Sequence, residues 1–104
     1  MKEDLHFEIK SSLGKRIRVT KGYWNRIVET KHAIMKGKEE IIKESLKNPD
    51  ELRTSRKDPK VVLHYKKIDK KYCCAVVKHL NGEGFIITTY MTDRIKIGEK
   101  HETN

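Results

Sequence analysis

Three alternating segments joined by short connections constrain the fold of this 104-residue chain most strongly. Apolar and polar residues alternate over residues 61–66, residues 72–79 form the most apolar segment, and residues 85–92 form a third. Such alternation is typical of strands, and Asn81-Gly82 favours a tight hairpin turn. Because strands joined by short turns pair antiparallel, the pattern predicts an antiparallel sheet, with residues 52–55 as a shorter fourth strand.

A helix is predicted ahead of these strands, at residues 23–35. Its apolar residues recur at spacings of three and four and would form one buried face: Trp24, Ile27, Val28, Ile34 and Met35. Thr20 is a suitable N-cap and Gly37 a suitable stop. Lys31 and His32 fall in or beside the apolar face, so this helix would direct them toward the sheet.

A second helix is predicted at residues 39–46, where Glu39 and Glu40 suit the positive end of the helix dipole. Residues 5–10 and 15–20 also alternate, and the first of these strands is interpreted as an N-terminal extension. The prediction is an α+β fold, barnase/RelE-like, with two N-terminal helices packed on a four-stranded antiparallel sheet. It forms a single domain over residues 1–104 with its core at about 15–98.

The formal net charge of +9 favours a polyanionic partner, nucleic acid above all. A lysine-rich surface that only keeps the chain in solution is the alternative. The basic residues are spread along the chain, which argues against binding to an anionic membrane. No apolar run could cross a bilayer and no signal peptide opens the sequence, so a cytoplasmic location is expected.

The two cysteines, Cys73 and Cys74, are neighbours in an apolar stretch. Neighbours in a strand point to opposite faces, so a disulfide between them would be strained, and we expect two reduced thiols. Neither has His or Cys partners at ligand spacing, so no metal and no cofactor is expected.

The motifs of nucleotide-binding folds, hydrolases and metalloproteases are absent from the sequence, and its acidic residues are too scattered for a two-metal nuclease. Cleavage of RNA would therefore proceed without metal. It needs a proton acceptor, a proton donor, cations and hydrogen-bond donors around the phosphate. The candidates for these tasks are His32, Arg53, Arg56, Lys78, Thr88 and Tyr90. His32 has the free pKa best suited to acid–base work near neutrality.

Each candidate also has an ordinary structural interpretation. A single histidine such as His32 beside an apolar stripe is more often a packed residue, and residues 53–57 can form a solvated basic loop. Lys78 can be a charge at the end of a strand, while Thr88 and Tyr90 are common strand formers.

Four short motifs follow one another along the chain at characteristic spacings. They are Trp24-x-x-Ile27 with Lys31-His32, the segment from Asn48 to Pro59, Val76-Val77-Lys78, and Gly84-Phe85-Ile86-Ile87-Thr88-Thr89-Tyr90. Together they resemble the phage-associated barnase–EndoU–colicin–RelE-like (BECR) nuclease domains, over roughly residues 17–98.

The resemblance implies a metal-independent endoribonuclease, acting as a toxin or effector through 2′-hydroxyl attack that leaves a 2′,3′-cyclic phosphate. The catalytic residues that it implies are His32, Arg56, Lys78, Thr88 and Tyr90, and Arg53 and Ser55 match it less closely. The predicted RNA contacts are Lys31, Arg53, Ser55 and Lys57. With the basic charge, it also implies an acidic antitoxin or immunity protein as partner. A non-catalytic RNA-binding module, or a protein-interaction module, is the alternative function.

Overall fold

The computed structural model describes residues 4–30 and 33–95 and the backbone of residues 99–100. Within these ranges the chain forms an α+β fold with one mixed sheet and two α-helices. The strands are β1 (Leu5–Lys10), β2 (Arg16–Thr20), β3 (Glu51–Thr54), β4 (Val61–Ile68), β5 (Lys71–His79), β6 (Glu83–Thr92) and β7 (Glu99–Lys100). The helices are α1 (Lys21–Thr30) and α2 (Glu39–Lys47), with a 3-10 helix, η1, at Ala33–Met35.

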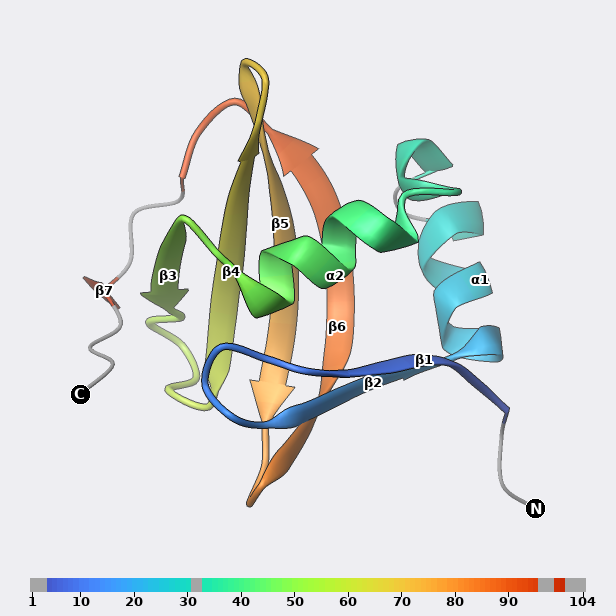
Figure 1. The fold of residues 1–104 in the computed structure, drawn as a ribbon, viewed down its shortest axis with the longest axis horizontal. Coiled ribbons are helices and arrows are strands. Elements are labelled where there is room, and N and C mark those ends of the chain that lie inside the picture. The colour runs from blue at the N-terminus through green and yellow to red at the C-terminus, as the bar shows by residue number, and fades with distance from the viewer. Residues whose placement is uncertain (1–3, 31–32, 96–98, 101–104) are drawn as a thin grey trace.

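The strand order of the sheet is β1-β2-β6-β5-β4-β3-β7, and α2 crosses one face of β4, β5 and β6 (Figure 1). Strands β3 to β6 pair antiparallel in chain order. The β1–β2 hairpin joins the sheet through a parallel pairing of residues 16–18 with residues 83–85. The predicted barnase/RelE-like arrangement, two N-terminal helices on a four-stranded antiparallel sheet, is therefore wrong. Two strands precede the helices and belong to the sheet.

The N-terminal hairpin belongs to the sheet because it completes the core. Phe7, Ile17 and Val19 are buried in the same cluster as the apolar faces of both helices. Gly84 allows both neighbouring strands to approach β6, since a Cβ there would lie 2.6 Å from the backbone oxygen of Lys78 in β5 and 3.0 Å from Cδ1 of Ile17 in β2. Alternation in the sequence marked both strands of the hairpin but could not reveal which strand lies beside them.

The first helix is shorter than predicted, because its α-helical part ends at Thr30. Its buried residues are Trp24, Ile27 and Val28, as predicted. Residues 33–35 form a separate 3-10 helix, whose three residues per turn break the spacing of the apolar stripe. Ile34, which was expected in the core, is consequently 62% exposed.

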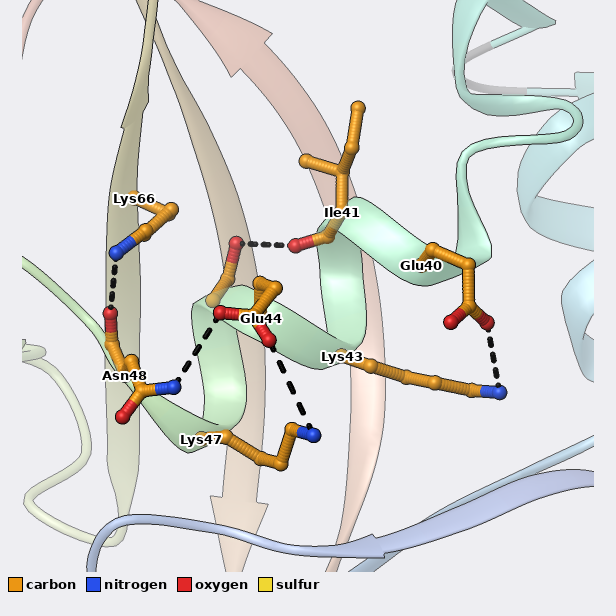
Figure 2. A network of polar contacts seen from close by, with 8 residues as sticks. Glu40, Ile41, Lys43, Glu44, Lys47, Asn48 and Lys66 are labelled. Carbon is orange, nitrogen blue, oxygen red and sulfur yellow. Dashed lines mark hydrogen bonds and ion pairs between the residues drawn. The ribbon is translucent and has the colours of Figure 1, made fainter.

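Helix α2 packs on the sheet through a buried face and is joined to it by a polar contact at its C-terminal end. Its buried residues are Ile42, Ser45 and Leu46. Nζ of Lys43 donates to Oε2 of Glu40, one turn back along the helix, at 3.0 Å (Figure 2). Nζ of Lys66 donates to the backbone oxygen of Asn48 at 3.0 Å, which fastens the C-terminal end of α2 to β4.

The central strands alternate between two sheet faces, each with its own cluster. The near face, which α2 covers, contributes Cys73, Ala75, Val77 and Ile86 to the main core. The opposite face, called the far face below, carries Leu63, Tyr65 and Cys74, with Val61, Tyr72, Val76, Tyr90 and Ile95 packed against them. Cys73 and Cys74 are therefore buried on opposite faces, as predicted, and no disulfide joins them.

Candidate functional site

A cavity of about 400 Å³ opens where the far face meets the connection between β3 and β4. Its lining residues are Arg53, Thr54, Ser55, Arg56, Lys57, Val61, Leu63, Val76, Thr88 and Tyr90. The lining brings together Arg56, Thr88 and Tyr90 from the predicted catalytic set and Arg53, Ser55 and Lys57 from the predicted RNA contacts. These residues come from two segments that are far apart in the sequence, so the tertiary structure creates the cavity.

One row of cross-strand neighbours runs through this cavity. Arg53 of β3 lies opposite Leu63 of β4, Leu63 opposite Val76 of β5, and Val76 opposite Thr88 of β6. Neighbouring strands lie about 4.8 Å apart, so two apolar side chains separate a cationic end from a hydroxyl end. A molecule with an apolar ring and an anionic group matches this row.

Two polar atoms at the ends of the row are buried without a partner. Neither Nε of Arg53 nor Oγ1 of Thr88 has a hydrogen-bond partner among the described residues. Nη2 of Arg53 lies 2.9 Å from Oε1 of Glu51, which holds the guanidinium against β3. A buried polar atom left unpaired costs about 1–3 kcal/mol, and a ligand that accepts from both groups would remove that cost.

Arg56 and Lys57 supply the exposed positive charge of the cavity. Both residues are exposed, and neither forms an ion pair within the described part of the chain. The turn that presents them is held in place because the amide of Lys57 donates to Oγ of Ser55 at 3.3 Å, and the amide of Ser55 to the carbonyl of Val61 at 2.9 Å. Their charges are therefore available to an anion at the cavity mouth.

Tyr90 contributes a phenol that stays protonated at neutral pH. Burial raises the pKa of Tyr90, and its contacts with Cys74 and Tyr65 raise it further. Such a phenol can donate or accept a hydrogen bond, but it does not serve as a general base near neutrality.

Lys78 lies beside the cavity. It pairs across β4 and β5 with Val61, which is a lining residue. The ammonium of Lys78 donates to Oδ2 of Asp58 and forms an ion pair with it. That hydrogen bond, with another from the backbone amide of Lys60, lowers the pKa of Asp58, so the carboxylate stays charged beside the lysine.

His32 and Lys31, predicted as the acid or base and as an RNA contact, lie outside the described residues. The described lining of the cavity comes from β3 to β6 and the β3–β4 connection, and neither α1 nor η1 contributes to it. The assignment of His32 therefore stays a prediction.

A bulge in β6 exposes an aromatic residue that the sequence analysis did not single out. Val76 pairs with Thr88 but Val77 pairs with Ile86, so Ile87 is the extra residue in β6. The bulge shifts the alternation, and Phe85 lies on the far face with Thr88 although an odd number of positions separates them. Phe85 is 38% exposed. Only the strand register could have revealed its position.

His64 is a fully buried histidine of the central sheet. It lies in β4 opposite Ala75, and its ring centroid is 5.7 Å from that of His79. Because it points away from the far face, it takes no part in the cavity.

Comparisons with protein-family models, with curated proteins and with solved structures found no match to this chain. Within the described residues, no helix has both the length and the apolar character needed to cross a membrane. What the cavity binds therefore has to follow from its own residues and charges.

Proposed function

We propose that this protein binds RNA and that the far-face cavity holds one nucleotide of it. The observation that carries the proposal is the row from Arg53 to Thr88, with Leu63 and Val76 in its middle and, at both ends, buried polar atoms that have no partner among the described residues. One phosphate can accept from the guanidinium at one end of the row and a neighbouring phosphate from the hydroxyl at the other, while a ribose or base contacts the apolar middle. The volume of about 400 Å³ lies within the usual range of about 300–1,000 Å³ for small-ligand sites.

The distribution of charge favours a polyanion over an isolated nucleotide. The chain has a net charge of +9. Arg56 and Lys57 place positive charge at the cavity mouth, and neither forms an ion pair with another described residue. Each phosphate that a cation neutralises releases counterions, so the affinity for RNA should fall as the salt concentration rises. On a single strand, each phosphate contact should lower the association constant by about 0.7 log units for every tenfold increase in salt.

The test is fluorescence anisotropy with a labelled RNA over a salt series. Arg56→Gln and Lys57→Gln should each weaken RNA binding several-fold. Each should also reduce the dependence of affinity on salt concentration by the amount that about one phosphate contact contributes. Lys47→Gln is the matched control, because it removes the same charge from the exposed side of α2. The proposal would be overturned if the wild type did not bind RNA at low salt. It would also be overturned if Lys47→Gln and Lys57→Gln lost equal amounts of RNA affinity.

Metal-independent cleavage of the bound RNA is a second candidate function. It is favoured because Arg56, Thr88 and Tyr90, which belong to the predicted catalytic set, line one cavity. Arg56 would stabilise charge on the phosphate and the two hydroxyls would orient it. The raised pKa of Tyr90 leaves the proton acceptor to another group, for which His32 is the prediction. A toxin or effector role with an acidic antitoxin or immunity protein belongs to this same hypothesis.

Cleavage is tested by incubating the protein with tRNA and mRNA in EDTA, followed by end-group analysis. We expect fragments that end in 2′,3′-cyclic phosphate, lost in His32→Ala and reduced in Arg56→Gln, with circular dichroism verifying both folds. Intact RNA in a sample that binds RNA tightly would reject cleavage and leave the binding function standing.

A further inference from the structure

Phe85 is an exposed aromatic side chain on a sheet surface that also carries the cavity. It is one of the large apolar residues that remain well exposed, at 38%, whereas Ile86 beside it is fully buried in the near-face core. Exposure of an aromatic ring at the centre of a sheet is unfavourable in water unless the ring has a partner. The bulge that reverses the alternation of β6 is what turns the ring outward.

Positive charge flanks Phe85 on both neighbouring strands. Lys78 of β5 lies opposite it on one side and Arg18 of β2 on the other. Asp58 pairs with Lys78, and Glu83 pairs with Arg18, whose hydrogen bond lowers the pKa of Glu83. An ammonium has three N–H donors and a guanidinium five, so each cation keeps donors for a phosphate while its carboxylate fixes its position.

The ring also lies between two cavities that share strand β6. Thr88, on the same face, lines the cavity already described. Phe85 and Arg18 line a second cavity of about 600 Å³, which residues of α1 such as Asn25 and Arg26 complete. A chain with regularly spaced phosphates can therefore follow the far face from one cavity to the other, past the aromatic ring.

We infer that the RNA bound by this face is single-stranded and that Phe85 stacks on one of its unpaired bases. The inference rests on the proposed RNA binding and names the class of RNA. Bases in a duplex are stacked on each other and present only their edges, whereas a base in a single strand can stack on an aromatic side chain. Cations on both sides of an exposed ring are the arrangement typical of proteins that bind single strands.

The experiment compares a labelled 12-nucleotide RNA as a single strand and as a duplex. Its 2′-fluoro form is used, because it cannot be cleaved through a 2′-hydroxyl. Phe85→Ala should weaken single-strand binding by about 5- to 150-fold, the range that one base–aromatic stack contributes, and leave duplex binding unchanged. Leu80→Ala is the matched control, because Leu80 is also 38% exposed, and it should bind as the wild type does.

A second variant guards against loss of fold in Phe85→Ala. Phe85→Trp keeps a stacking surface, should retain single-strand affinity, and should show quenching of the new indole on binding, since Trp24 is buried. Wild-type binding of duplex as tightly as single strand, or full single-strand affinity in Phe85→Ala, would overturn the inference and leave RNA binding intact. Failure of the wild type to bind either RNA would instead overturn the proposed function.

Discussion

Thr88→Val should make the protein more stable and a weaker binder of RNA. The substitution exchanges a buried hydroxyl, unpaired among the described residues, for a methyl group of similar size. An unpaired buried polar group costs about 1–3 kcal/mol. Because the residue as a whole is only half-buried, we take the lower end and expect the free energy of unfolding to rise by about 1 kcal/mol. For a domain of about this size that corresponds to a rise in Tm of about 4–8 °C, measurable by circular dichroism.

The same substitution should reduce RNA affinity at least about tenfold. A hydrogen bond to a charged group contributes about 1.5–3 kcal/mol, and each 1.4 kcal/mol is a factor of ten in affinity. The loss should be read in the anisotropy assay at fixed salt. A variant that gains folding stability and loses RNA affinity is expected where the replaced residue serves ligand binding at a cost in stability.

Thr89→Val provides the control within the same strand. Oγ1 of Thr89 is also buried without a partner among the described residues, but Thr89 pairs with Ala75 and points to the near face. This variant should gain stability in the same way and bind RNA as the wild type does. Destabilisation of Thr88→Val by about 1 kcal/mol or more would refute the reasoning, and so would equal effects of the two variants on RNA affinity.

Three further predictions concern single contacts. Burial raises the pKa of Glu39, but its 2.7 Å hydrogen bond with Nε2 of His6, together with weaker electrostatic interactions, lowers that pKa by more, so the pKa lies below 4.5. A lowered pKa stabilises the fold at pH values above the unfolded-state pKa, so Glu39→Gln should unfold more easily than wild type at pH 7. In urea titrations this difference should shrink as the pH falls below 4.5 and vanish once the pH is below the folded-state pKa. Gly84→Ala should cost about 1–3 kcal/mol in the same titration, because its Cβ would lie 2.6 Å from the backbone oxygen of Lys78 in β5. An unchanged midpoint would contradict the close approach of β5 and β6 at Gly84. Asp58→Asn should tighten RNA binding, because it removes a carboxylate that pairs with Lys78 next to the cavity; weaker binding at low salt would show that Lys78 needs this partner for its position.

Local elements of this fold could be predicted from the sequence because local patterns encode them. The strand at Leu5–Lys10, the turn at Asn81-Gly82 and the start of α2 at Glu39 match the predictions. Thr20 caps α1 as expected, since its Oγ1 accepts from the amide of Tyr23 at 3.2 Å. The grouping of Thr88 with Tyr90 on one face followed from simple alternation, and both line the cavity.

The partners of these elements were decided only in the tertiary structure. Alternation shows that residues form a strand and which of them share a face, but it does not specify the neighbouring strand, so the parallel pairing of β2 with β6 was missed. Nor does it reveal a bulge, because an extra residue such as Ile87 is defined only by the register of the opposite strand. The bulge places Phe85 beside Thr88 on the far face. Strand pairing places Arg53 in the same row of cross-strand neighbours as Thr88. The sequence alone thus determined the helices, strands and turns and the candidate residues on them, while long-range pairing decided which of those residues meet.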